Sequence, residues 1–248
     1  MTRALTSYFE RGYRFHKLEP GAPSRKHEAP VARGKPETQD KREKTAMRAV
    51  FLIHGWGVRA ISMGHLASAL ADAGFTVYNY DYPTSERTIA EHSDVFLSMY
   101  RAVLNADNPA EVYFVTHSMG GLLLRAALAQ MSEAECRRVE AVVMLGPPNR
   151  GSALAYFGDS RGVRGINASL ADMTPSPESY VMNIPPPPFL PPVGIVAGKF
   201  DGKVSPDSTL LPEGQPCERI VVPCTHPGLR NPKHTLAPIL NFFRTKAF

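Results

Sequence analysis

The chain has 248 residues, of which 43% are apolar and 21% are charged, a composition typical of a globular protein. No apolar run approaches the roughly 20 residues that a membrane-spanning helix requires, and the N-terminus lacks the apolar core of a secretory signal, so we expect a cytoplasmic protein without stable membrane insertion. The net charge of +5 is unevenly placed: residues 1–48 carry 12 Lys/Arg and 6 Asp/Glu, whereas the rest carries 16 and 17. The folded part is therefore nearly neutral, and no nucleic-acid groove is predicted.

The first 46 residues differ in composition from the rest of the chain. They are rich in Lys, Arg, Glu, Pro and Gly, and residues 17–45 contain almost no large apolar side chains. A segment of this kind cannot bury enough apolar surface to fold. We therefore expect a basic, disordered tail over residues 1–46 and one α/β domain over residues 47–248.

Six continuous apolar segments predict buried strands over residues 49–53, 75–81, 112–115, 138–145, 193–198 and 218–222. The spacing of apolar residues between them predicts helices over residues 63–73, 86–104, 119–131 and 232–244. Because strands alternate with helices and are apolar throughout, we expect an α/β fold with a mostly parallel six-stranded sheet and helices on both faces. Residues 149–192 are irregular and rich in proline, and we expect them to form a pocket wall or a small cap.

A serine stands where the third of these strands turns into a helix. The apolar run over 112–115 stops shortly before Ser118, and Gly120 and Gly121 follow at once before a second apolar run. A turn this tight brings backbone against backbone, where a Cβ would clash. It would also expose the serine hydroxyl at the carboxyl edge of the sheet, beside helix N–H groups, which is the geometry of a nucleophile elbow.

A serine nucleophile requires a base and a carboxylate that orients the base. In folds with this elbow, the acid and then the histidine follow the serine along the chain. His226 comes soon after the last strand, in a loop at the carboxyl edge, and is preferred to His234, which lies inside the final helix. Asp201 follows the strand over 193–198 most closely and is preferred to Asp207.

Two backbone N–H groups are needed to stabilise the oxyanion of an acyl-transfer reaction. Met119, at the start of the helix after Ser118, is expected to supply one, and Trp56, in the His-Gly-Trp-Gly turn, is expected to supply the other. His54 and His117 flank the same turns, but both precede the serine in the chain. We therefore expect them to be structural hydrogen-bonding residues rather than bases.

With these residues assembled, the chain resembles the α/β-hydrolase superfamily, and most of all the small bacterial lipase- and esterase-type members that also resemble GPI-inositol deacylases. The matching segments are F-L-I-H-G-W-G (51–57), T-H-S-M-G-G (116–121), L-G-P-P-N-R-G-S (145–152), D-G-K-V-S (201–205) and Thr225-His226. The resemblance implies a minimal α/β-hydrolase fold with Ser118 as nucleophile, Asp201 as acid and His226 as base. It also implies the two oxyanion donors named above and a reaction without metal or cofactor. One departure is Thr116, where the elbow pattern usually has glycine and where a β-branched residue crowds the turn.

The function that we expect is hydrolysis of a carboxylic ester, of a small molecule or a lipid, through an acyl-serine intermediate. Apolar residues in the irregular segment favour acyl chains as the bound group; they are Leu154, Tyr156, Phe157, Phe189 and Leu190. Two alternatives stay open, namely an acyltransferase that uses the same triad and a non-catalytic scaffold that binds a ligand or a partner protein. The oligomeric state cannot be predicted from the sequence.

Overall fold

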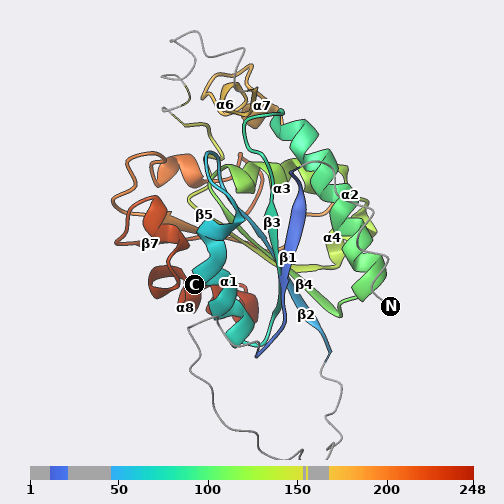
Figure 1. Ribbon diagram of the computed structural model, residues 1–248. Helices are drawn as coiled ribbons and strands as arrows, with labels where there is room; N and C mark the ends of the chain where they lie inside the picture. Colours follow the sequence, from blue (N-terminus) through green and yellow to red (C-terminus); the bar gives the residue numbers. More distant parts are fainter. Residues whose placement is uncertain (1–11, 22–45, 153–154, 156–167) are drawn as a thin grey trace, which may run out of the picture.

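The computed structural model describes residues 12–21, 46–152, 155 and 168–248. These residues form a seven-stranded sheet in the order β1-β3-β2-β4-β5-β6-β7 (Figure 1). The strands are β1 (Arg14–Leu18), β2 (Arg48–Ile53), β3 (Thr76–Asp81), β4 (Glu111–His117), β5 (Val139–Leu145), β6 (Val193–Gly198) and β7 (Glu218–Val222). Every neighbouring pair is parallel except β1 and β3. The predicted α/β class is confirmed, and the six expected strands all form.

Helices cover both faces of this sheet (Figure 1). They are η1 (Ala60–Met63), α1 (Gly64–Asp72), α2 (Ile89–Asp107), α3 (Met119–Gln130), α4 (Glu133–Arg137), α6 (Ala168–Ala171), α7 (Tyr180–Asn183), η3 (Asp207–Thr209), η4 (Pro227–Arg230) and α8 (Pro232–Thr245). Alternate side chains of β4 serve the two faces: Val112 and Phe114 join the core that includes α2 and α3, whereas Tyr113 and Val115 join the core that includes α1 and α8. A strand buried on both faces is apolar at every position, which explains the continuous pattern in the sequence.

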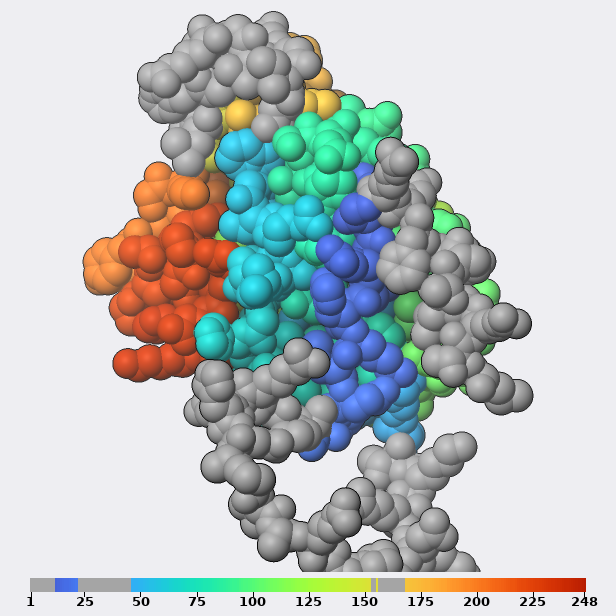
Figure 2. Space-filling model, in the orientation of Figure 1, coloured from blue at the N-terminus to red at the C-terminus, as the bar shows by residue number. Residues whose placement is uncertain are grey.

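The strand β1 corrects the prediction for the N-terminal segment. It falls within residues 1–46, which composition predicted to be disordered, yet it pairs antiparallel with β3 and places Phe15 opposite Tyr80. The Phe15 ring lies 5.5 Å from that of Phe51 and 5.1 Å from that of Tyr80, centroid to centroid. In Figure 2 this segment is the blue strip on the surface of the domain. The expected strand number was one too low because a single aromatic residue among charged ones gives too short a pattern to identify a strand.

Two helix boundaries follow from local capping. Helix α2 begins at Ile89, three residues later than predicted, because Thr88 forms a capping box with Glu91. Helix α4 was not predicted, although Ser132 and Glu135 form the same kind of box at its start. A capping pair of this spacing is visible in the sequence and could have identified the helix.

The irregular segment between β5 and β6 is described only in part. Residues 153–154 and 156–167, with Leu154, Tyr156 and Phe157 of the predicted pocket wall, lie outside the described residues. The described part contains two short helices, α6 and α7. Among the described residues, no helix has the length and apolar character needed to cross a membrane.

Candidate active site

Ser118 occupies a strained turn between β4 and α3. Its φ of 54° and ψ of −127° lie in a region that residues other than glycine rarely adopt. The turn is held on both sides, since the Ser118 N–H donates to the carbonyl of Leu145 at 2.9 Å and the Ser118 carbonyl accepts from the N–H of Gly121 at 2.9 Å. Such strain persists only where the surrounding structure enforces it, and it is concentrated at functional sites.

Glycine is required at two positions where the end of β2 and the residues after it pack against this turn. A Cβ on Gly120 would lie 2.4 Å from the carbonyl oxygen of Ile53, and a Cβ on Gly55 would lie 2.8 Å from the Cβ of Ser118. The sharp turn therefore depends on both glycines, as predicted for Gly120. Thr116, the departure from the elbow pattern, is fully buried at the end of β4 and is compatible with the turn.

Asp201 and His226, from the loops after β6 and β7, form a hydrogen-bonded pair. The Nδ1 of His226 lies 2.6 Å from Oδ2 of Asp201, and Oδ1 of Asp201 accepts the backbone N–H groups of Lys203 at 2.8 Å and Val204 at 2.9 Å. Burial acts to raise the pKa of Asp201, but the hydrogen bonds from His226 and the backbone outweigh it, so the pKa lies below its usual value. Asp201 is therefore an ionised carboxylate that fixes the orientation of the His226 ring.

The two less favoured candidates lie elsewhere. The Asp207 side chain is 89% exposed and pairs with Arg219 at 3.2 Å. His234 lies on α8, away from the residues that line the cavity described next. Neither Asp207 nor His234 lines the cavity that contains Ser118.

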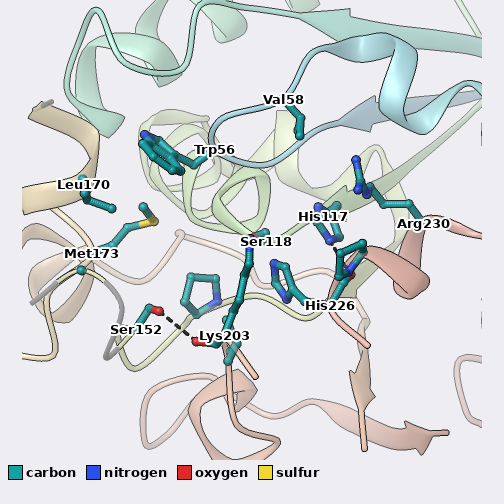
Figure 3. Close-up of a pocket in the computed structure, with 14 residues that line it drawn as sticks. Trp56, Val58, His117, Ser118, Ser152, Leu170, Met173, Lys203, His226 and Arg230 are labelled. Atoms are coloured by element: carbon teal, nitrogen blue, oxygen red, sulfur yellow. Dashed lines mark hydrogen bonds between the residues drawn. The ribbon is translucent and has the colours of Figure 1, made fainter. Parts of the chain in front are cut away.

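Ser118 and His226 line one cavity of about 270 Å³. Figure 3 shows the Trp56, Leu170 and Met173 side chains on one side of Ser118 and the His226 ring on the other. The Ser118 hydroxyl forms no hydrogen bond with any described residue, and therefore none with the His226 ring. Phe189 and Leu190, expected in the pocket wall, instead pack against the core on the side of α2 and α3.

The two predicted oxyanion donors belong to turns that meet at Ser118. Met119 is the first residue of α3, where backbone N–H groups lack a partner within the helix. Trp56 follows Gly55, whose backbone adjoins Ser118, and the Trp56 residue lines the cavity with 40% of its surface exposed. Their roles as donors stay predictions.

His117 has a connection that the sequence did not reveal. Its Nε2 donates to the backbone carbonyl of His226 at 3.1 Å, which ties the end of β4 to the loop of the expected base. Burial, and then the neighbouring His226, hold the pKa of His117 well below its ordinary value, so the ring is neutral. His54 also has the expected structural role, because its ring stacks on Tyr82 at 4.3 Å and its Nδ1 lies 2.9 Å from the carbonyl of Gly55.

The chain was compared with known families and structures. Residues 50–238 match the model of the alpha/beta hydrolase family. A search of curated proteins found no match. Within the part of the chain that the structure describes, no three His, Cys, Asp or Glu side chains form a group that could hold a metal ion.

Similar solved structures include a lipase, a phospholipase and an esterase. The lipase BlEst2 of Bacillus licheniformis in its mature form is 14% identical, with a TM-score of 0.63, and the match covers 83% of this chain and 96% of the lipase. Phospholipase PlaB of Legionella pneumophila is 18% identical, with a TM-score of 0.65, and the match covers 82% of this chain but 60% of PlaB. The esterase RhEst1 of Rhodococcus sp. ECU1013 is 18% identical, with a TM-score of 0.53, and the match covers 80% and 91%. These structures share the fold, and the match over residues 50–238 shows that the chain belongs to the alpha/beta hydrolase family.

Proposed function

We propose that the protein is a serine hydrolase that cleaves carboxylic esters, with Ser118 as nucleophile, His226 as base and Asp201 as orienting acid. Membership in the alpha/beta hydrolase family supports a hydrolase activity in general. The observation that carries the finer assignment is the Asp201–His226 hydrogen bond of 2.6 Å at the cavity that Ser118 also lines. A buried carboxylate paired with a histidine beside a strained serine is the arrangement that acyl transfer requires.

The proposed reaction has two steps. The His226 Nε2 takes the proton of the Ser118 hydroxyl as Oγ attacks the ester carbonyl, and the resulting oxyanion is stabilised by the N–H groups of Trp56 and Met119. The C–O bond to the alcohol then breaks, and His226 returns the proton to the leaving oxygen. Water, deprotonated by His226 in turn, attacks the acyl-serine and releases the carboxylic acid together with free Ser118.

We expect the hydrogen bond between His226 and the serine hydroxyl to form in the complex with substrate, since both residues line the same cavity. Catalytic hydrogen bonds are often long in a structure without substrate and shorten in the complex. The hydrogen bonds to Nδ1 of His226 and to its backbone carbonyl leave Nε2 of the ring for this role. The tautomer with the proton on Nδ1, favoured by Asp201, is the one in which Nε2 can act as a base.

The cavity supports a small acyl group as the part of the ester that is buried. Its volume of about 270 Å³ lies near the lower end of the range for ligand pockets. Trp56, Leu170 and Met173 give one side an apolar surface. The lipases and the esterase with the same fold are consistent with an ester of a small molecule or a lipid.

Labelling with a fluorophosphonate probe tests the nucleophile. The wild type should be labelled at Ser118, and Ser118→Ala should not be labelled. Ser152→Ala is a matched control, because Ser152 lines the same cavity but donates its hydroxyl to the carbonyl of Lys203 at 3.0 Å. Loss of labelling in Ser152→Ala with full labelling of Ser118→Ala would refute the assignment.

A panel of p-nitrophenyl esters of increasing chain length tests the substrate class. Fast turnover of short and medium acyl chains is expected, and a flat profile would contradict an apolar acyl pocket. Analysis of products with added amine, thiol or alcohol acceptors separates hydrolysis from acyl transfer. A wild-type protein that is neither labelled nor active on any ester would favour the alternative of a non-catalytic scaffold.

A further inference from the structure

A cation without a partner among the described residues shares the cavity of the proposed catalytic histidine. Arg230 ends the η4 turn, four residues after His226, and its side chain lines the same cavity as Ser118. Its guanidinium forms no hydrogen bond or ion pair with any described residue, and its Nε is buried without a partner. A buried N–H group of a charged side chain that lacks an acceptor is costly, so an acceptor for it is expected in the functional state.

No acidic side chain among the described residues compensates the charge of Arg230. The described residues that line the cavity include Arg230 and the exposed Lys203 but no Asp or Glu. The carboxylate of the site, Asp201, is already occupied by His226 and two backbone N–H groups. Burial alone lowers the pKa of Arg230, with no contribution from an acidic neighbour, and arginine stays charged at neutral pH. The described lining of the cavity is therefore cationic.

The charge and the apolar surface lie on opposite sides of the nucleophile. In Figure 3, Trp56, Leu170 and Met173 lie to one side of Ser118, whereas Arg230 lies to the other, beyond the His117 ring. An ester attacked by Ser118 would place its acyl and alcohol parts on different sides of the hydroxyl. One part of the ester would therefore lie against the apolar side chains, and the other part would lie near Arg230.

We propose that the substrate is an anionic ester, whose carboxylate or phosphate group pairs with Arg230 while the acyl chain occupies the apolar side. This inference rests on the proposed function and specifies its substrate class. The guanidinium suits both anions, since its planar N–H groups can donate two parallel hydrogen bonds to the oxygens of a carboxylate or a phosphate. Partial burial strengthens such a pair relative to one in water, and a neutral ester would leave the Nε of Arg230 without an acceptor.

The test compares matched esters that differ in charge. One pair is the acyl glycolate and the acyl glycolamide, and the other is the 2-acyloxyethyl phosphate and 2-acyloxyethanol, each with the acyl chain that the wild type hydrolyses fastest. The quantity measured is kcat/KM for the anionic ester divided by kcat/KM for its neutral partner. The wild type should prefer the anion by about tenfold to a hundredfold, in line with a charged hydrogen bond in a partly buried site. The pair with the larger ratio tells whether the anion is a carboxylate or a phosphate.

Variants connect this preference to Arg230. Arg230→Gln should reduce the ratio to about one, whereas Arg230→Lys should keep part of it, because the charge remains but the planar fork is lost. The ratio is independent of any general loss of activity. Arg244→Gln is the matched control, since Arg244 lies on α8 with its Nη2 bonded to Asn241 at 3.0 Å and does not line the cavity; it should leave the ratio unchanged.

The outcomes separate this inference from the proposed function. Turnover of all four esters with a wild-type ratio near one, or a preference that survives Arg230→Gln, would overturn the anionic substrate but leave the esterase assignment intact. A preference lost in Lys203→Gln but kept in Arg230→Gln would likewise overturn the role of Arg230. Absence of both turnover and labelling at Ser118 would overturn the proposed function and this inference together.

Discussion

Two buried aspartates at the carboxyl edge of the sheet have contrasting partners. The Asp81 side chain, at the end of β3, is 5% exposed, and that of Asp201, after β6, is fully buried. Oδ1 of Asp81 accepts from Nε of Arg59 at 2.8 Å and from the N–H of Ala60 at 2.9 Å, while Oδ2 pairs with Nη2 of Arg59 at 2.7 Å. Asp201 instead pairs with His226, whose ring lines the cavity.

The partner, rather than burial, separates a structural carboxylate from a candidate catalytic one. Arg59 is a permanent cation that satisfies the charge of Asp81 in every state of the protein. A histidine can gain and lose a proton near neutral pH, so a carboxylate paired with it can support a proton transfer. Asp81 ends β3 and Asp201 follows β6 by three residues, so position relative to a strand does not by itself distinguish them.

The largest effect is expected from Asp201→Asn. The amide would leave the fold intact but would favour the wrong tautomer of His226, and kcat should fall by about 10⁴-fold. Asp207→Asn is the control, because Asp207 is exposed and remote from the cavity. Ester turnover and the melting temperature of both variants measure the result, and a comparable loss of activity in the two would remove Asp201 from its proposed role.

A smaller effect is expected from Gly146→Ala, which disturbs the Asp201–His226 pair without replacing either residue. Gly146 has a φ of 56°, and an added Cβ would lie 2.7 Å from Leu229 and 3.3 Å from Oδ2 of Asp201. Steric overlap of this kind typically costs about 1–3 kcal/mol of stability, and kcat should fall by about tenfold as the pair is displaced. The control is Gly202→Ala, where an added Cβ meets nothing within 4 Å and should change neither quantity. Wild-type kcat in Gly146→Ala would show that the pair tolerates displacement.

Asp81→Asn should affect stability rather than activity. Removal of the carboxylate leaves Arg59 and the N–H of Ala60 with weaker acceptors, and we expect the free energy of unfolding to fall by about 2 kcal/mol, with kcat within about threefold of the wild type. Chemical denaturation and ester turnover on the same samples measure the two quantities. A loss of activity larger than that of Asp201→Asn would reverse the comparison between the aspartates.

The loss of stability in Asp81→Asn should depend on pH. Burial acts to raise the pKa of Asp81, but the hydrogen bonds from Arg59 and from the N–H of Ala60 outweigh it, so its pKa in the folded protein lies below the unfolded value of about 3.9. Its stabilising contribution is therefore present above about pH 4 and is lost as the pH falls below that value. The difference in stability between the wild type and Asp81→Asn should shrink on acidification from pH 6 to about pH 3, and a difference that grows would contradict the assignment.

The smallest effect is expected from Arg14→Ala. Nε of Arg14, on β1, lies 3.3 Å from Oδ2 of Asp81, but the Arg14 side chain is 49% exposed and Arg59 already pairs with the same carboxylate. An exposed pair contributes at most about 1 kcal/mol, and high salt reduces it further. Denaturation at low and high salt measures this contribution; a loss above about 2 kcal/mol would mean that Arg14 has a larger part in holding β1.

Much of the fold could be predicted from the sequence, because strands that are buried on both faces appear as continuous runs of apolar residues. β1 could not, because it is a short edge strand in which Phe15 and Leu18 stand among basic residues. Its stability comes from rings far away in the chain, including Phe51 and Tyr80. Pairing of this kind depends on tertiary packing, which the composition of a 46-residue window does not record.

In the candidate site, too, some features could be predicted from the sequence and others could not. Ser118, Asp201 and His226 could be selected because each lies within a few residues of the end of a predicted strand, and parallel strands end at the same edge of a sheet. The bond from His117 to the backbone of His226 and the lack of a partner for Arg230 could not be selected. Both depend on which side chains are buried together, and no local sequence signal encodes that.

The position of β1 has a practical consequence for the design of truncated chains. A boundary drawn at residue 46, as composition suggests, would remove a strand that covers the outer edge of β3. The exposed backbone N–H and C=O groups of β3, with the uncovered rings of Tyr80 and Phe51, would then offer a template for pairing between molecules. Light scattering should show aggregation of such a fragment, whereas a fragment that keeps residues 12–21 should remain monodisperse.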